Sequence, residues 1–167
     1  LVNVNTGINN RGELVVDGVH VGRALLHELL PVFPNRRSAD IHGRAADGSI
    51  VVVVGTDAPL DPLTLKAVAK RVTLGLGRVG MISHESSGDL FLAFSTTRTI
   101  SQDEVAAGKP LETDTAHIDA LFEATADATE AAVYDALFSA KTMTGANGVT
   151  LYGLPWERVR PMLQRAR

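Results

Sequence analysis

Ser49 has the sequence context best suited to chemistry. It follows Gly48 at the end of a polar loop and directly precedes the apolar run Ile50–Val54, so a small hydroxyl residue opens a predicted strand. Cleavage of the bond between Gly48 and Ser49 would give this serine a free α-amino group beside its own hydroxyl. The unperturbed pKa of such an amine is roughly 7.7–8.0, which suits a general base acting on that hydroxyl. A serine that simply begins a strand is the alternative.

A second polar cluster, Ser86–Asp89, directly precedes the apolar run Leu90–Phe94. If the two runs pair as strands, the Ser87 hydroxyl and the Asp89 carboxylate arrive beside Ser49. Ser87 would then bridge to the hydroxyl or amine of that serine, while Asp89 would fix its orientation and favour the ammonium form. A polar turn in which the aspartate caps a loop is the alternative explanation.

Asn5 is a candidate donor to an oxyanion. It precedes Thr6 and Gly7 and ends a segment in which apolar and polar residues alternate, as in a half-buried strand. A side-chain amide stabilises the negative charge of a tetrahedral intermediate, and removing one such donor typically costs about 10²–10³ in rate. A turn is the alternative, because asparagine followed closely by glycine is typical of turns.

The composition excludes several other kinds of site. The 167-residue chain contains no cysteine, so it has no disulfide, thiol nucleophile or cysteine metal ligand. Its five histidines show no zinc-like spacing, and a net charge of −3 with scattered basic residues gives no indication of nucleic-acid binding. No apolar run approaches the length of a membrane span. We therefore expect no metal, no cofactor, and no nucleic-acid or membrane partner.

The segment Gly75–Gly80 matches the dinucleotide-binding pattern G-x-G-x-x-G. In that fingerprint the glycines join a strand to the start of a helix, where amide groups hold a pyrophosphate. Here they fall at the end of a helical pattern. We expect them to allow close packing against the sheet or to end the helix, rather than to bind a nucleotide.

The periodicities predict one α/β domain, a sheet covered by helices, and the 45% apolar content is enough for a real core. The valine-rich strand is expected to be buried on both faces. Residues 31–48 are expected to form a long loop, and residues 96–115 form a polar stretch with no predicted helix or strand. Strands are predicted at 1–6, 13–16, 49–55, 90–94 and 149–152, and helices at 23–30, 61–79, 117–143 and from Pro155 onward.

Several segments together resemble the L-aminopeptidase/D-esterase family, which includes the β-peptidyl aminopeptidases. They occur in the family's order and extend over nearly the whole chain, at 49–60, 87–96, 121–125 and 141–145. The segment that ends at Asn5 also resembles a family strand, with Asn3 where the family has glutamine and Val4 where it has alanine. By position, Ser49 matches the family's nucleophile and Asn5 its oxyanion asparagine. Ser87 matches its second active-site serine, and Asp89 the acidic residue after that serine.

The resemblance implies an α/β/β/α sandwich and a precursor that cleaves itself between Gly48 and Ser49. Residues 1–48, with the processing loop 31–48, would then end an α subunit. Residues 49–167 would form a β subunit in the same domain. The chain begins within a predicted strand and without methionine, so we expect it to be the C-terminal part of a longer protein that supplies the rest of the sandwich.

The leading hypothesis is a self-processing serine aminopeptidase or amidase. It would remove N-terminal residues from small peptides, amides or esters through an acyl-enzyme on Ser49. The resemblance also implies a homo-oligomer of processed heterodimers. A cytoplasmic location is expected, and a periplasmic one stays open. The alternatives are an acyl transferase like ornithine acetyltransferase, whose family nucleophile is threonine, and an inactive fragment or structural subunit.

Overall fold

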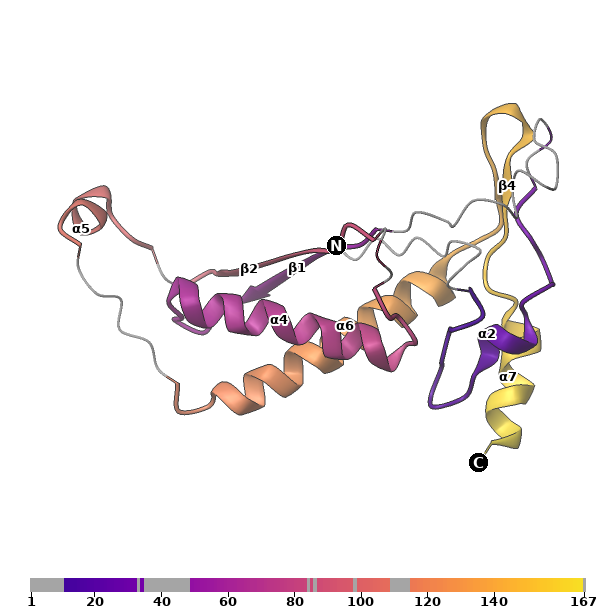
Figure 1. The fold of residues 1–167 in the computed structure, drawn as a ribbon, viewed down its shortest axis with the longest axis horizontal. Coiled ribbons are helices and arrows are strands. Elements are labelled where there is room, and N and C mark those ends of the chain that lie inside the picture. Colours follow the sequence, from indigo (N-terminus) through magenta and orange to yellow (C-terminus); the bar gives the residue numbers. More distant parts are fainter. Residues whose placement is uncertain are drawn as a thin grey trace.

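The computed structural model describes residues 11–32, 34, 49–83, 85, 87–97, 99–108 and 115–166. The predicted strand 1–6 and most of the predicted loop 31–48 lie outside these ranges. Within them, the chain forms a parallel pair of strands, two long helices on one side of that pair, and a small unit containing a hairpin and a C-terminal helix (Figure 1).

The strands β1 (Val51–Thr56) and β2 (Leu90–Ser95) form the parallel pair. Val51 lies opposite Leu90, and each following residue keeps this register. The Leu90 amide donates to the Ile50 carbonyl at 2.9 Å, which extends the pairing one residue upstream of β1. Four consecutive valines favour the extended backbone of β1 because their side chains are branched at Cβ. Both predicted strands, and their pairing, are confirmed.

The helix α4 (Pro62–Arg78) connects β1 to β2. Asp61 caps its first turn, because one carboxylate oxygen accepts hydrogen bonds from Leu63 N at 2.7 Å and Thr64 N at 3.0 Å. Pro62 fits the first helical position, where its missing N–H costs nothing. The predicted helix 61–79 is confirmed, and the buried residues of its apolar stripe are Val68, Ala69, Val72, Leu76 and Val79.

The helix α6 (Ile118–Ser139) packs beside α4 in the same layer (Figure 1). The predicted helix 117–143 extends too far at its C-terminal end. The backbone becomes extended at Ala140, because the residues that follow enter a hairpin instead. In that hairpin, β3 (Met143–Thr144) pairs antiparallel with β4 (Thr150–Leu151), the latter inside the predicted strand 149–152.

Two short predictions upstream of β1 are wrong. The predicted strand 13–16 is reduced to a single bridge between Val16 and Val19, around a turn at Asp17 and Gly18. The predicted helix 23–30 is replaced by α2 (Val21–Ala24). Leu29 has a φ of +49°, which no right-handed helix accommodates, and the Arg11 guanidinium donates to the carbonyls of Glu28 and Leu29.

Two helices complete the described chain. The helix α5 (Gln102–Ala106) lies within the polar stretch 96–115, where no helix was expected, and is held by a capping box between Ser101 and Glu104. The helix α7 (Trp156–Arg165) begins directly after Pro155, as predicted. Among the described helices, none is long and apolar enough to cross a membrane.

Two clusters of buried side chains hold these elements together. The first fills the space between the strand pair and the helices α4 and α6, and consists of Ile50, Val52, Val72, Leu76, Val79, Val133 and Leu137. The second attaches the segment before β1 to α7, and consists of Val16, Val21, Leu25 and Val159. Because Leu14, Tyr134 and Leu154 pack against both clusters, the two form a continuous core.

Helices cover one face of the strand pair, and no described helix or strand covers the other. Val52 is 2% exposed on the covered face, whereas the side chains on the opposite face are exposed: Val51, Val53, Leu90, Leu92 and Phe94. The prediction that β1 is buried on both faces is therefore wrong for the described residues. An apolar sheet face of this kind is what a second layer would cover, as in the sandwich implied by the family resemblance.

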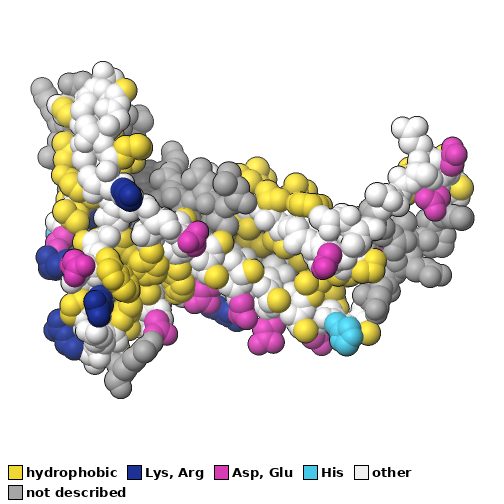
Figure 2. Space-filling view, turned by 180° about the vertical axis from the view of Figure 1, so that it is seen from behind, with side chains coloured by type: hydrophobic (Ala, Val, Ile, Leu, Met, Phe, Trp, Pro, Cys, Tyr) yellow, Lys and Arg dark blue, Asp and Glu magenta, His cyan; other side chains and the backbone are white. Residues whose placement is uncertain are grey.

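Charged side chains are unevenly distributed along the molecule (Figure 2). Acidic residues follow the exposed side of α6, where Arg78 of α4 pairs with Asp127 at 2.5 Å and Glu130 at 3.3 Å (Figure 2). Basic residues gather at the end that carries α7, where Arg158 pairs with Glu28 at 2.6 Å (Figure 2).

Two glycines of the dinucleotide-like pattern, Gly75 and Gly80, have a role in packing or in helix termination. A Cβ on Gly75 would lie 2.4 Å from the Ala126 carbonyl oxygen and 2.7 Å from Thr129 Cβ, so glycine lets α4 approach α6. Gly80 has a φ of +94° and ends the helix. Close packing and helix termination were expected, but the packing partner is a helix rather than the sheet.

Substitution of Gly75 by alanine should lower the free energy of unfolding by about 1–3 kcal/mol, because the added methyl forces α4 and α6 apart. Gly77 provides a matched control in the same helix. Nothing lies within 4 Å of a Cβ built there, so Gly77→Ala should leave stability unchanged or raise it by up to about 1 kcal/mol. Urea unfolding followed by circular dichroism measures both, and equal effects of the two substitutions would contradict the packing argument.

Tyr134 links α6 to the segment before β1. Its hydroxyl lies 3.1 Å from a Glu130 carboxylate oxygen and 3.3 Å from the Val15 carbonyl oxygen. Burial, together with the hydrogen bond to Glu130, raises the pKa of Tyr134 from 10.0 to about 12. The folded protein therefore holds the phenol proton more tightly than the unfolded chain does.

The contribution of Tyr134 to stability should be complete below about pH 10 and should disappear as the pH rises to about 12. We predict that Tyr134→Phe flattens the alkaline fall in the free energy of unfolding, measured by chemical denaturation across that interval. Tyr152→Phe is the control, because the Tyr152 hydroxyl makes no hydrogen bond within the described residues. An unchanged alkaline slope in Tyr134→Phe would refute the assignment.

Candidate active site

The parallel register brings Ser49 next to the polar cluster that precedes β2. Ser49 and Gly88 each stand two residues upstream of the first paired residues, Val51 and Leu90. The Gly88 amide donates a hydrogen bond to the Ser49 hydroxyl oxygen at 3.1 Å. This hydrogen bond connects the segment before β1 to the polar cluster before β2, although the two are far apart in the sequence.

Ser87 and Asp89 form the second contact of the site. The Ser87 hydroxyl donates to a carboxylate oxygen of Asp89 at 2.5 Å, and both side chains are half-buried. A hydrogen bond to an ionised carboxylate is short and strong, so it fixes both side chains. The bridge from Ser87 to Ser49 that the sequence suggests is not present in this state, and it stays a prediction for a cleaved chain.

The contact from Gly88 was not anticipated from residue types. A backbone donor cannot be recognised from the residue type, and only the strand register identifies which amide faces the Ser49 hydroxyl. Gly88 also leaves room for that hydroxyl, because a Cβ built on it would lie 3.2 Å from the Ser49 oxygen. The glycine therefore provides a donor and a close approach at the same point.

Ser49 lies on the uncovered side of the sheet. The side chains of Ser49 and Val51 are exposed, whereas that of Ile50 between them is 2% exposed and lies in the core. The alternation of a strand therefore continues through Ser49. The backbone at this point is anchored by Ile50, while the hydroxyl faces the side away from α4. A reacting group would therefore approach from the side opposite the helices.

No conventional base accompanies Ser49 in the described part of the chain. The hydrogen bond from Gly88 is the only one that the structure shows for its hydroxyl among these residues, and no histidine or lysine is bonded to it. Within the same residues, no group of three or more His, Asp or Glu side chains is placed to hold a metal ion. Asn5 and Gly48 lie outside the described residues, as does His84.

Comparison with known proteins decides the family. The model of Peptidase family S58 matches residues 1–151. The chain belongs to this family. It is 39% identical, over 173 aligned positions, to the beta-peptidyl aminopeptidase BapA of Sphingosinicella microcystinivorans, covering 100% of this chain and 43% of that protein. The chain thus spans less than half the length of this relative.

Solved structures agree with this assignment. The L-aminopeptidase D-Ala-esterase/amidase of Ochrobactrum anthropi, a prototype for the serine aminopeptidases with a variant of the Ntn hydrolase fold, matches with a TM-score of 0.71 and 30% identity. A protein of Pyrococcus horikoshii matches with a TM-score of 0.73 and 34% identity. Each match covers 93% of this chain and 40% of the other. The predicted α/β class, as part of a larger fold, and the family resemblance are confirmed.

Proposed function

We propose that the protein containing this chain is a serine aminopeptidase that activates itself by cleavage between Gly48 and Ser49. The observation that carries the proposal is the hydrogen bond from the Gly88 amide to the Ser49 hydroxyl, with the Ser87–Asp89 pair directly beside it. Membership of Peptidase family S58 and the similarity to beta-peptidyl aminopeptidases support hydrolysis at a peptide N-terminus.

Self-cleavage would begin when the Ser49 oxygen attacks the Gly48 carbonyl carbon. The C–N bond between the two residues breaks, an ester forms on the serine oxygen, and the serine nitrogen becomes a free amine. Water then hydrolyses the ester, which leaves a carboxylate on Gly48 and restores the Ser49 hydroxyl. Residues 1–48 and 49–167 would become the two subunit segments, still held together by the shared core.

In turnover, the freed amine of Ser49 would act as the base. It would accept the hydroxyl proton as the oxygen attacks the carbonyl carbon of the substrate's first residue, and it would deliver that proton to the departing amine. Water would hydrolyse the acyl-enzyme. The lack of a histidine or lysine on Ser49 among the described residues favours this source of the base, because the amine's unperturbed pKa lies near 7.7–8.0.

The neighbouring groups have separate proposed roles. The Gly88 amide fixes the position of the Ser49 oxygen, and Asn5, by family resemblance, would donate to the oxyanion of the tetrahedral intermediate. Asp89 holds Ser87 in place and would favour the ammonium form of the Ser49 amine once proton transfer has occurred. The substrates would be small peptides or amino-acid amides and esters, and the processed protein is proposed to assemble as a homo-oligomer.

The full-length protein should appear as two fragments by intact-mass spectrometry, with the new N-terminus at Ser49. Ser49→Ala should leave a single uncut chain that has no activity on amino-acid amides. Ser139→Ala is the matched control, because its exposed hydroxyl, at the C-terminal end of α6, donates to Asp135 and makes no hydrogen bond to Ser49. An uncut wild-type protein that still hydrolyses amino-acid amides would overturn the mechanism.

Substitutions beside Ser49 should slow cleavage without unfolding the protein. Ser87→Ala removes the hydrogen bond to Asp89, and we expect the cleavage rate to fall by about tenfold or more, as for the loss of a hydrogen bond to a charged group. Gly88→Ala should also slow cleavage, because the new methyl presses on the Ser49 oxygen. A time course of intact mass measures both rates. Wild-type rates in both variants would show that this cluster takes no part.

A further inference from the structure

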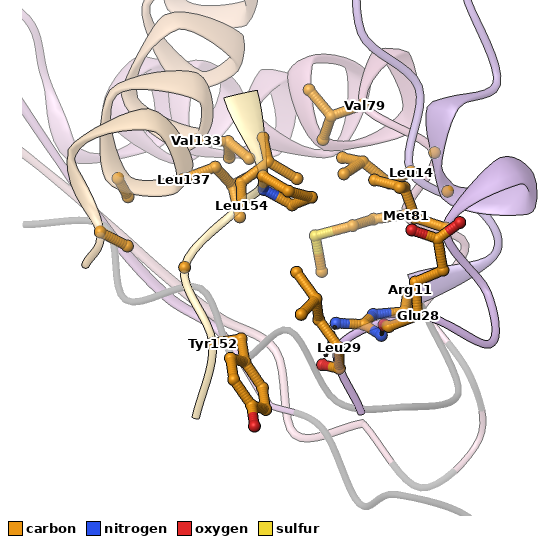
Figure 3. A pocket seen from close by; sticks show the side chains of 17 residues that line it. Arg11, Leu14, Glu28, Leu29, Val79, Met81, Val133, Leu137, Tyr152 and Leu154 are labelled. Carbon is orange, nitrogen blue, oxygen red and sulfur yellow. Dashed lines mark hydrogen bonds between the residues drawn. The ribbon is translucent and has the colours of Figure 1, made fainter. Parts of the chain in front are cut away.

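A cavity of about 160 Å³ lies at the opposite end of the helix layer from α5. It is bounded by the C-terminal ends of α4 and α6, by the α2 region and by the segment before α7 (Figure 3). Most of its lining is apolar, including Leu14, Val79, Met81, Val133, Leu137 and Leu154. A dry cavity of about 150 Å³ accepts one benzene molecule, so this one has room for a group of that size.

The Arg11 guanidinium lies in the cavity wall beside Leu29, across from Tyr152 (Figure 3). It is held in place by two backbone carbonyls, donating to Glu28 O and, at 3.0 Å, to Leu29 O. A guanidinium has five N–H groups, so these contacts leave further donors. Within the described residues, no carboxylate pairs with Arg11.

Glu28 is the one carboxylate among the described residues of the lining, and its charge is paired. Glu28 accepts a hydrogen bond from Arg158 at 2.6 Å, so its negative charge is paired outside the cavity wall. Arg11, Glu28 and Arg158 together carry one net positive charge, and a further carboxylate, Glu13, lies outside the lining. Further basic side chains of α7 lie at the same end of the molecule (Figure 2). Arg11 is therefore the charged group of the described lining that is left to pair with an anion.

Arg11 is also partly desolvated. Burial lowers the pKa of its guanidinium from the usual value for arginine, which means that the protein environment disfavours the charge. The group nevertheless stays protonated, because the pKa of arginine is far above neutrality. A bound anion would offset the desolvation, and a carboxylate matches the planar geometry of the guanidinium.

We propose that this cavity binds a small carboxylate with an apolar tail about the size of one aromatic ring. The carboxylate lies on Arg11, and the tail lies among the apolar side chains around Met81 and Leu137. The lining contains none of Ser49, Ser87 and Asp89, so the site is distinct from the candidate active site and does not depend on the proposed function. Apolar amino-acid derivatives that keep a free carboxylate belong to this chemical class.

Phenylacetate and its neutral isostere phenylacetamide test the proposal on the full-length protein. Methionines labelled with ¹³C at the methyl group give the readout, and Met81→Leu identifies the Met81 signal. We expect phenylacetate to shift that signal in a saturable way. Phenylacetamide should bind about tenfold or more weakly, because it cannot pair with the guanidinium. This comparison needs no substitution of Arg11.

Two variants distinguish the contribution of the Arg11 charge to binding from the contribution of the apolar cavity. Arg11→Gln should weaken phenylacetate binding by about tenfold or more and leave phenylacetamide binding nearly unchanged. Arg160→Gln is the control, because it removes an exposed arginine of α7 that does not line the cavity. Equal affinity for the two ligands in the wild type would overturn the role of Arg11. A Met81 signal that neither ligand shifts would overturn the site itself.

Discussion

The parallel pairing of β1 with β2 is the interaction on which the candidate active site depends. In a parallel pair both strands start at the same edge, so the residues that precede them meet there. Ser49 precedes one strand and Ser87–Asp89 precede the other, and the hydrogen bond from Leu90 to the Ile50 carbonyl fixes their relative position. An antiparallel pair of the same two segments would have placed the serine and the carboxylate at opposite ends.

The helix layer makes this pairing rigid. The crossover helix α4 must return the chain to the starting edge, and its close contact with α6 at Gly75 fixes the distance between the two helices. Ile50 is buried in the same core as Leu76 and Val133, so packing against the helices holds the backbone beside Ser49 in place. A side chain can then be exposed and reactive while its backbone stays in place. A packing defect between the helices would therefore disturb the site from a distance.

The two faces of the strand pair have different roles. Helices cover one face, and the Ser49 hydroxyl lies on the other, among exposed valine and leucine side chains. The relatives in Peptidase family S58 are more than twice as long as this chain. The exposed apolar face and the length of the relatives are consistent with a sandwich whose second layer comes from residues outside this chain. Substrate access would then be decided between the two layers.

The sequence by itself determined the elements with strong local signals. Four valines specified β1, Asp61 and Pro62 specified the start of α4, and the segments around Ser49 and Ser87 specified the family. Local signals failed where a long-range contact replaced a local one. The predicted helix 23–30 was lost because Arg11 binds the Glu28 and Leu29 carbonyls, and the end of α6 moved because the next residues joined β4.

Only the tertiary structure decided which amide faces Ser49 and which side of β1 is covered. Strand register and helix placement are set by contacts between residues far apart in sequence. A backbone N–H such as that of Gly88 is common to nearly all residue types, so the sequence does not show which one acts as a donor. The same holds for the cavity beside Arg11, which exists because segments from both ends of the chain meet there. Residue types determined what chemistry was available, and packing decided which groups could act together.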